Sequence, residues 1–539
     1  MRPAGKIRKP ITWDGHLSKA WSAVPLRPVL ESLGPALAQN GRPLVIFDDG
    51  VAVTGTELLD RVERFAGVLK KLVVSGERVL LACGNRAEYL VAYFGILANR
   101  CAVVAVNPGL GSHDMAHAIN GVSCALAVAD VDAAATVEAV LGNCPSLRSV
   151  LRIDGPEPGG LSHLEQDGDR VLLRDVRADL ADLIDIGYTS GTTGLPKALA
   201  GDHTELLRYV DVALRAQPPA LDERTLLGLQ FHYGDPLAST VAAALSHTSV
   251  VVMRRFSVSR FWPTAKRFGA TRIVTIGSIP NLLLATPPST ADRDHRVRSA
   301  LAIGIPKDAH AILEERFGFP WREGYGSSES GPAIAMPPHA AIEFVGTGAL
   351  GVPLPDIRAR LVDAEGHELE GPAEGELELA GAILFRGYLN DPEATAEVMH
   401  DEWFRTGDIM RRDEHGVYYF LGRRKELIRR GGENVAPAEV EAVLRLHDAV
   451  IDAAVVPVPD PLRGEEIKAY VQVRPGADIG PAALADFCAD HLARFKVPRY
   501  VELRTDPFPR TPSQRVRKHA LTVDGEHTVD NAWDRIRDR

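Results

Sequence analysis

With 539 residues the chain exceeds what one compact core can hold, and it predicts roughly three or four domain-sized units. Its 45% hydrophobic and 24% charged residues, without an apolar run long enough for a membrane span or the apolar core of a signal peptide, are typical of a cytoplasmic protein. The net charge of -10 argues against general nucleic-acid binding, because a surface that follows phosphates needs a basic excess.

From about residue 40 to 310, short apolar runs alternate with helix-like amphipathic segments. Strands separated by helices indicate doubly wound parallel sheets, an α/β fold in which ligands lie at the carboxyl ends of the strands. The five cysteines lack CxxC spacing, and we interpret them as reduced core residues rather than disulfides or ligands of a structural zinc. The predicted strands are Val79–Cys83, Ala102–Val106, Leu126–Ala129, Ser249–Met253, Arg272–Ile276 and Ala300–Gly304.

A loop rich in hydroxyl groups and glycine, Tyr188–Ala198 (YTSGTTGLPKA), follows the apolar run Leu183–Ile186. Its hydroxyls, its lysine and the backbone N–H groups that glycine leaves unshielded suit a bound phosphate. A Walker A loop is excluded, because Lys197 follows Pro196 and precedes alanine, whereas a mobile linker is the remaining alternative. The candidate ligands of phosphate are Thr189, Ser190, Gly191, Thr192, Thr193, Gly194 and Lys197.

A second motif, Gly324–Gly331 (GYGSSESG), combines an aromatic ring, hydroxyls and a carboxylate. Tyr325 can stack on a purine, Ser328 can bind a phosphate oxygen, and Glu329 can help to hold Mg²⁺. Its alternative is a plain surface turn. The residues that we place at a nucleotide are Tyr325, Gly326, Ser327 and Ser328.

Beyond residue 340 the pattern changes to alternating runs such as Arg358–Asp363 and Glu374–Ala380, which favour antiparallel strands in a small barrel or twisted sheet. In Trp403–Ile409 (WFRTGDI), Asp408 has two oxygens that could accept both hydroxyls of a ribose, and its alternative is a type I turn. In Gly422–Asn434, Arg423 beside Lys425 suits ribose or phosphate, and its alternative is a solvated charge run.

A compact α+β unit of about a hundred residues is predicted next, close to the commonest domain size. Pro509–Lys518 presents three cations, Arg515, Arg517 and Lys518, after a proline-stiffened turn, and an exposed basic tail is the alternative. From Val523 we expect a polar, loosely ordered tail in which Trp533 could dock. The predicted elements are helix Pro437–Arg445, strands Val450–Pro457 and Lys468–Val473, helix Pro481–Leu492 and strand Tyr500–Leu503.

In order and spacing, these five motifs resemble the ANL superfamily of adenylate-forming enzymes over nearly the whole chain. The resemblance implies a large N-terminal domain, residues 1–424, with a small β-barrel-like subdomain at about 340–424. A small mobile C-terminal α+β lid domain, 425–522, and a polar tail, 523–539, would follow. It also implies a ligase: a small carboxylic acid attacks the α-phosphate of ATP, and the lid then rotates so that coenzyme A attacks the acyl-adenylate.

The resemblance also implies a role for each motif, with ATP, Mg²⁺ and coenzyme A as cofactors. The loop ending at Lys197 would grip the ATP phosphates, Glu329 and Thr192 would lie at the magnesium, and Asp408 would bind ribose. Arg423 would contact the nucleotide, and Lys425 would be the hinge pivot. His232 corresponds to the mouth of the acyl pocket, with a satisfied structural histidine as the alternative. A homodimer is left open as the oligomeric state.

The chain departs from the family in its final loop, where PxTxxGK normally supplies a lysine that bridges the carboxylate and the α-phosphate. Gln514 and Arg515 occupy that place here. Arginine keeps the charge but changes the geometry, so reduced adenylation is one reading, and Lys518, one helical turn away, is another candidate. The expected catalytic residues are Lys197, Glu329, Arg515 and Lys518.

Two segments, Arg429–Glu441 and Trp533–Arg535, look most like the carnitine/crotonobetaine-CoA ligase-like and FadD-like fatty acyl-CoA synthetase branch, which implies fatty acid metabolism. In that branch Gly432 and Glu433 would face the pantetheine channel. Two rival functions stay open: a stand-alone domain that loads a carrier-protein thiol, and a nucleotide-binding protein with impaired turnover or none because Arg515 replaces lysine.

Overall fold

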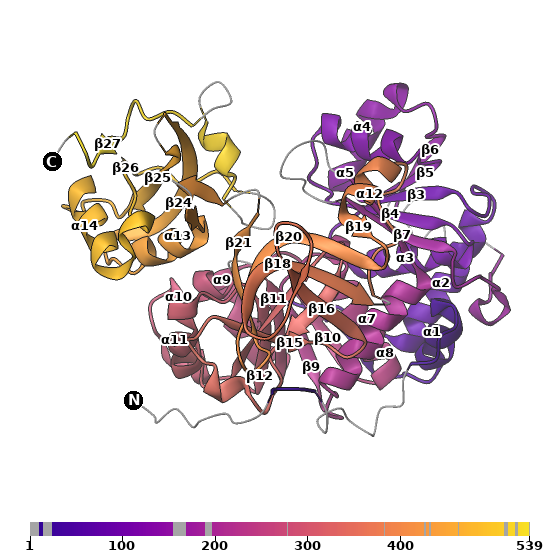
Figure 1. Cartoon of the computed structure of the whole chain (residues 1–539). Helices are drawn as coiled ribbons and strands as arrows, with labels where there is room; N and C mark the ends of the chain where they lie inside the picture. Colours follow the sequence, from indigo (N-terminus) through magenta and orange to yellow (C-terminus); the bar gives the residue numbers. More distant parts are fainter. Residues whose placement is uncertain are drawn as a thin grey trace.

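The computed structural model contains two parallel-strand regions and a smaller C-terminal unit (Figure 1). Within the described residues the strands form three sheets, and the mixed α/β class expected from the sequence is confirmed. The structure describes residues 10–13, 24–154, 169–188, 197–276, 279–381, 383–424, 427–430, 433–461, 463–510, 516–522 and 527–537.

The first sheet has the strand order β6-β5-β3-β4-β7-β8, and every neighbouring pair is parallel except β7 and β8. Successive residues of β3 join different cores, since Val79 and Leu81 pack with α2 and α3, whereas Leu80 and Ala82 pack with α4 and α5. Both faces are therefore covered by helices, as a doubly wound sheet requires. The elements are α2 (Gly55–Leu69), β3 (Arg78–Ala82), α3 (Ala87–Ala98), β4 (Ala102–Val106), α4 (Ser112–Gly121), β5 (Leu126–Ala129), α5 (Val131–Val140), β6 (Ser149–Arg152), β7 (Leu183–Tyr188) and β8 (Ala198–Asp202).

The second and largest sheet starts with the parallel strands β1, β10, β9, β11, β12 and β13, with β2 antiparallel at its edge. The elements of this half are α1 (Val29–Ala38), β1 (Pro43–Phe47), β2 (Ala52–Thr54), α7 (His203–Ala216), β9 (Arg224–Leu227), α8 (Asp235–Ser246), β10 (Ser249–Val252), α9 (Val258–Arg267), β11 (Arg272–Ile276), α10 (Ile279–Leu284), β12 (Ser299–Ile303), α11 (Lys307–Phe317) and β13 (Trp321–Ser327).

The same sheet continues with antiparallel strands in the order β14-β15-β21-β20-β18-β16-β17, so the change from parallel to antiparallel falls at the β13–β14 hairpin. The alternating pattern beyond residue 340 correctly indicated this half. Its elements are β14 (Gly331–Ala335), β15 (Ala349–Pro353), β16 (Ile357–Val362), β17 (Glu368–Leu369), β18 (Ala373–Gly381), α12 (Pro392–Val398), β19 (Met399–His400), β20 (Trp403–Arg412) and β21 (Tyr418–Arg423).

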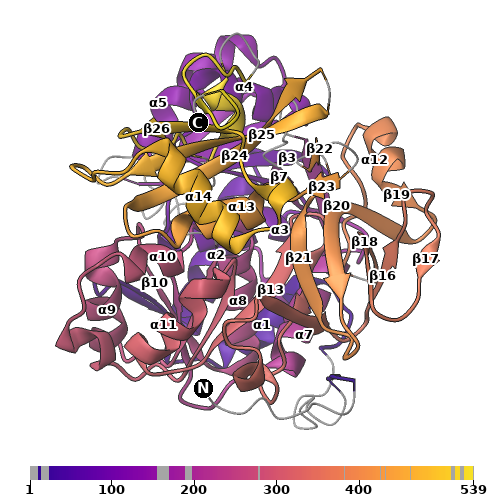
Figure 2. The same ribbon diagram turned by 60° about the vertical axis from the view of Figure 1, so that its left-hand side comes forward.

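The C-terminal unit has a core of its own, built from its sheet, α13 and α14. Figures 1 and 2 show this unit in gold and yellow, beyond the end of β21. Its sheet has the order β23-β22-β25-β26-β27, and β24 also pairs with β25. The elements are β22 (Ile428–Arg430), β23 (Glu433–Val435), α13 (Pro437–Arg445), β24 (Val450–Asp460), β25 (Gly464–Val473), α14 (Pro481–His491), β26 (Tyr500–Arg504) and β27 (Trp533–Asp534).

The tail differs from its prediction in one respect. Trp533 docks, as expected, but residues 533–534 form the strand β27 and pair with β26 instead of lying loosely. Arg499 anchors this strand through the carboxylate of Asp534, at 3.0 Å, and Asp534 is buried. The composition of the tail is polar, yet this ion pair, the packing of Trp533 and a 2.6 Å hydrogen bond from Lys468 Nζ to the carbonyl of Thr528 anchor its described part. The predicted domain limits stay predictions.

Two further observations complete the fold. All five cysteines are buried and free, in agreement with their interpretation as core residues. Among the described residues, no helix combines the length and the apolar character that crossing a membrane would require. The short 3-10 helices are η1 (Leu141–Asn143), η2 (Leu173–Asp175), η3 (Phe231–Tyr233), η4 (Thr290–Arg293), η5 (Ala341–Glu343), η6 (Arg494–Lys496) and η7 (Lys518–Leu521).

Candidate active site

Asn85 ties the carboxyl ends of the two parallel sheets together. It follows β3, and its amide donates hydrogen bonds to the carbonyls of Leu229 and Met253, both at 2.8 Å, beyond the ends of β9 and β10. Its oxygen accepts a 2.7 Å hydrogen bond from the backbone N–H of Phe231. Sequence reasoning missed Asn85, because a lone polar residue after a strand carries no distinctive pattern.

His232 lies in η3, immediately after the backbone that Asn85 holds. Burial lowers the pKa of its imidazole to about 4, so the ring is neutral at pH 7. Its Nδ1 is buried and has no hydrogen-bond partner among the described residues, whereas a satisfied structural histidine would have one. The ring centroid lies 4.4 Å from that of Tyr233.

The predicted phosphate loop connects β7 to β8, which pair directly through Tyr188 and Ala198. The loop therefore begins at the carboxyl end of a strand, as the sequence indicated, although β7 is only partly buried. Lys197 is described and stands immediately before β8, whereas the candidates Thr189, Ser190, Gly191, Thr192, Thr193 and Gly194 lie outside the described residues.

The β13–β14 hairpin displays the second motif at its tip. Gly326 lets the two strands approach closely, since a Cβ there would lie 2.4 Å from the carbonyl oxygen of Gly331. Ser327 and Ser330 brace the turn, because each backbone N–H donates to the other's hydroxyl, at 3.0 and 3.2 Å. Ser328 is exposed, so its hydroxyl is accessible to a ligand.

Tyr325 and Asp408 meet at one end of this motif. The Tyr325 hydroxyl donates to Asp408 Oδ2 at 2.5 Å, and Arg423 Nε lies 3.1 Å from Oδ1. Asp408 and Arg423 face each other on the paired strands β20 and β21. Burial, reinforced by Asp408, holds the pKa of the Tyr325 phenol well above its ordinary value, so the hydroxyl remains a donor. The plain-turn alternative for Asp408 does not account for these contacts.

At the other end of the motif, Glu329 meets Lys197 through Tyr388, which sequence reasoning missed. The Tyr388 hydroxyl donates to Glu329 Oε1 at 3.1 Å, and Lys197 Nζ lies 4.9 Å from the centre of the tyrosine ring. Burial, together with the charge of Glu329, raises the pKa of the Tyr388 phenol. The place of Tyr388 between Glu329 and Lys197 depends on its pairing with β8, which is far away in the sequence, so local sequence patterns could not reveal it.

Glu329 fits a magnesium ion by its chemistry. It is a half-buried carboxylate, and the hydrogen bond that it accepts from the Tyr388 hydroxyl uses Oε1. Hard cations such as Mg²⁺ prefer such oxygen ligands and keep water in the remaining positions. The second metal candidate, Thr192, lies outside the described residues.

The candidates in the C-terminal unit are only partly described. Lys518 Nζ pairs with Glu441 Oε1 of α13 at 2.7 Å, so its charge is engaged within this unit. Lys425, Gly432 and Arg515 lie outside the described residues. For Glu433 the backbone lies in β23, and its side chain is outside the description.

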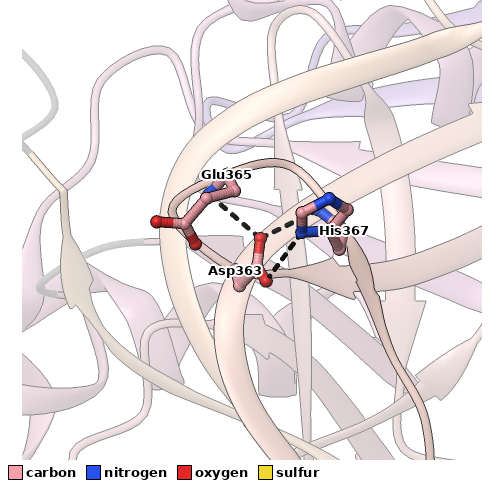
Figure 3. A group of neighbouring side chains, drawn as sticks. All are labelled: Asp363, Glu365 and His367. Carbon is pink, nitrogen blue, oxygen red and sulfur yellow. Dashed lines mark hydrogen bonds and ion pairs between the residues drawn. The ribbon is translucent and has the colours of Figure 1, made fainter.

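A separate cluster with metal-binding residue types lies on the turn from β16 to β17, at Asp363, Glu365 and His367 (Figure 3). Asp363 Oδ1 accepts the backbone N–H groups of Glu365 and His367, at 3.0 and 2.8 Å, and His367 Nδ1 lies 3.2 Å from Oδ2. These bonds are those of a tight polar turn at the sheet edge, and we assign no metal to it.

Two protein-family descriptions match this chain, one over its large N-terminal part and one over its C-terminal unit. The AMP-binding enzyme family matches residues 35–389, and the AMP-binding enzyme C-terminal domain matches residues 439–515. Sulfoacetate–CoA ligase of Cupriavidus necator is 36% identical over 337 residues, 62% of this chain and 65% of that protein. Crotonobetaine/carnitine–CoA ligase of Salmonella paratyphi C is 28% identical over 479 residues, 86% of this chain and 92% of that protein.

The fold agrees with a solved structure along almost its whole length. ATP-bound MatB from Rhodopseudomonas palustris superimposes with a TM-score of 0.84 at 25% identity. The match covers 92% of this chain and 98% of that one. A large domain of sheets followed by a smaller C-terminal domain is thus common to both chains.

Proposed function

This chain belongs to the AMP-binding enzyme family, within the ANL superfamily of adenylate-forming ligases, and we propose that it joins a small carboxylic acid to coenzyme A. Enzymes of this kind use ATP, Mg²⁺ and coenzyme A. A cytoplasmic location, where ATP and coenzyme A are supplied, is part of the proposal. The similarity to crotonobetaine/carnitine–CoA ligase supports the branch that the sequence suggested.

One observation carries the proposal. The short segment Tyr325–Glu329 contacts Asp408 at its first residue and, through Tyr388, reaches Lys197 at its last. Groups suited to ribose and to phosphate thus come from separate parts of the chain to the two ends of one hairpin. A triphosphate nucleotide has this order of groups.

The chemistry requires positioning and charge neutralisation more than a protein nucleophile. An oxygen of the acid forms a bond to the α-phosphorus as the bond to pyrophosphate breaks. A thiolate then bonds to the acyl carbon as AMP leaves. Lys197 supplies positive charge at the phosphates, and Asp408 with Tyr325 orients the nucleoside. Glu329 and Thr192 would hold a magnesium ion, which would neutralise phosphate charge.

His232 belongs to this proposal as a residue at the mouth of the acyl pocket. Its unpartnered Nδ1 and its neutral ring make it available to a substrate group. His232→Ala should raise the KM for the acid while the KM for ATP stays constant. Equal changes in both constants would assign His232 to the fold instead.

Arg515 is our candidate for the group that bridges the carboxylate and the α-phosphate. Lys518, the other candidate, is paired with Glu441 in this structure. Arg515→Ala should therefore slow acid-dependent pyrophosphate release by about a hundredfold or more, as loss of a charged transition-state contact does, while Lys518→Ala has a smaller effect. Equal rates for Arg515→Ala and the wild type would remove Arg515 from the mechanism.

Lys425 and Gly432 would act in the second step, as the hinge and the pantetheine channel, together with Glu433. Gly432→Leu should then spare pyrophosphate release and block thioester formation. Loss of both half-reactions together would contradict this assignment.

The deciding experiment is a screen of carboxylic acids for coenzyme-A-dependent AMP formation. The panel should contain sulfoacetate, crotonobetaine, carnitine and uncharged short and medium acids. We expect one class to give both acid-dependent pyrophosphate release and thioester. ATP binding without pyrophosphate release for any acid would favour a nucleotide-binding protein, and transfer only to a carrier-protein thiol would favour a loading domain.

A further inference from the structure

Tyr388 lies in a segment, Phe385–Leu389, that the chain folds back against β8. Leu199 and Tyr388 form an antiparallel bridge, and the Leu389 N–H donates to the Ala198 carbonyl at 2.8 Å. Lys197 immediately precedes this pairing. The register of one backbone against another therefore sets the place of Tyr388 beside the lysine.

The same segment also reaches the β13–β14 hairpin. The Phe385 N–H donates to the backbone carbonyl of Glu329 at 2.9 Å, while the Tyr388 hydroxyl donates to the Glu329 carboxylate at 3.1 Å. Glu329 is thus held by its main chain and by its side chain from one short stretch.

Other contacts make this stretch rigid. The Tyr388 N–H donates to Thr395 Oγ1 of α12 at 2.9 Å, and Arg386 pairs with Asp202 at 2.8 Å. Gly387 has a φ of +125°, and a Cβ there would lie 2.8 Å from the Thr395 side chain, so only glycine fits. The position of Tyr388 is therefore built into the backbone around it.

We propose that Tyr388 is a positioning residue that sets Lys197 and Glu329 for joint contact with metal-bound nucleotide phosphates. Its hydroxyl engages Glu329 Oε1, so that the other oxygen, Oε2, would be left to bind a cation. Its ring face attracts the Lys197 ammonium without neutralising it, whereas a carboxylate in that place would compete with phosphate. This inference rests on the proposed function for the identity of the nucleotide, ATP.

The test separates the hydroxyl from the ring by two substitutions. Tyr388→Phe keeps the ring beneath Lys197 and removes the donor to Glu329, and Tyr388→Leu removes both. Tyr419→Phe, on β21, is a matched control. The Tyr419 hydroxyl donates to Asp413 Oδ2 at 2.9 Å, and the guanidinium of Arg411, on β20, lies 3.9 Å from the centre of the tyrosine ring. The control therefore loses the same kind of bond outside the candidate site.

Calorimetric titration with ATP, with and without Mg²⁺, gives a readout that needs no turnover. Tyr388→Phe should lose about tenfold in affinity in the presence of Mg²⁺, as expected for one hydrogen bond to a charged group, and nothing in its absence. Tyr388→Leu should also bind metal-free ATP about threefold or more weakly, because Lys197 loses its aromatic contact. Tyr419→Phe should match the wild type in both titrations.

A second readout is the rate of pyrophosphate release against Mg²⁺ concentration. Tyr388→Phe should need more Mg²⁺ for half-maximal rate, and saturating Mg²⁺ should restore kcat. Wild-type affinity of Tyr388→Phe in both titrations, or an equal loss with and without Mg²⁺, would overturn the inference. A wild type that binds ATP with Mg²⁺ but activates no acid would refute the ligase function alone.

Discussion

The two ends of the candidate nucleotide site use the same three chemical groups in different surroundings. At the ribose end, the Tyr325 hydroxyl lies 2.5 Å from the carboxylate of Asp408, beside Arg423, and Asp408 is only 2% exposed. At the phosphate end, the Tyr388 hydroxyl lies 3.1 Å from Glu329, with Lys197 over the ring, and all three residues are half-buried.

The ribose end is therefore a fixed support, whereas the contacts at the phosphate end can adapt to a ligand. Asp408 Oδ2 accepts the Tyr325 hydroxyl, and Oδ1 lies beside Arg423 Nε. Asp408 and Tyr325 are buried, where a hydrogen bond to a charged group is strong and its loss costly. Glu329 and Lys197 keep more access to solvent, so a metal ion and phosphate oxygens can take the place of water. We therefore expect substitutions at the ribose end to have larger effects than matching ones at the phosphate end.

The largest effect should follow Asp408→Asn. The amide removes the negative charge that the Tyr325 hydroxyl binds at 2.5 Å and that Arg423 Nε approaches at 3.1 Å, and losing a hydrogen bond to a buried charge together with a partly exposed ion pair costs about 3 kcal/mol. We expect kcat/KM for ATP to fall at least about a hundredfold, measured as pyrophosphate release over a range of ATP concentrations. Asp413→Asn, outside the site, is the control, and an unchanged constant for Asp408→Asn would contradict the comparison.

The stability of the protein should depend on pH through β7, the strand that precedes the phosphate loop in the chain. Burial raises the pKa of Asp185, on β7, to about 7, and its Oδ1 has no hydrogen-bond partner among the described residues. A carboxyl whose folded-state pKa lies above its unfolded value stabilises the fold at low pH, and this contribution is lost between about pH 4 and pH 7. Asp185→Asn should reduce that loss.

The measurement is the thermal midpoint at pH 5 and pH 8. The wild type should lose more than Asp185→Asn on going to pH 8, by about 3 °C or more. Parallel pH profiles would show that Asp185 ionises normally. Burial and the charge of Asp185 raise the pKa of Glu205, on α7, to about 8. The thermal midpoint of Asp185→Asn should therefore still fall between pH 5 and pH 8, but by less than that of the wild type.

Tyr325→Phe directly tests the order of the two ends. It removes one hydrogen bond to a buried charge, worth about 1.5 to 3 kcal/mol, so the KM for ATP should rise tenfold to a hundredfold. That rise should exceed the loss in Tyr388→Phe. Tyr418→Phe, which removes a 3.3 Å bond to the Ala359 carbonyl and a contact with Arg412, both outside the candidate site, should not change the KM. A larger effect of Tyr388→Phe than of Tyr325→Phe would show that burial does not determine which of these two contacts matters more.

The smallest effect is expected for Arg386→Ala. Arg386 pairs with the buried Asp202, but the Arg386 side chain is 60% exposed, and we expect an ion pair with one solvated partner to contribute only about 1 kcal/mol. The Mg²⁺ concentration for half-maximal pyrophosphate release should change by less than about fivefold. A larger change would mean that the Tyr388 segment depends on this ion pair more than on its backbone pairing with β8.

Much of the fold could be predicted because buried parallel strands are continuous apolar runs. The limits of Ala102–Val106, Leu126–Ala129 and Arg272–Ile276 agree with the structure to the residue. The tail was harder, since a strand of two residues, Trp533–Asp534, has no periodicity of its own. Its pairing with β26 and the ion pair to Arg499 are long-range contacts, which composition cannot indicate.

The amino-acid sequence by itself determined the family, the strand–helix alternation and the residues suited to phosphate, metal and ribose, because these depend on local composition and spacing. Only the tertiary structure decided which of them meet. Tyr388 became a link between Lys197 and Glu329 through the register of its segment against β8, and Asn85 became a clamp through three hydrogen bonds to distant backbone. Such contacts arise when separated segments pack, and a tyrosine or an asparagine alone gives no sign of them.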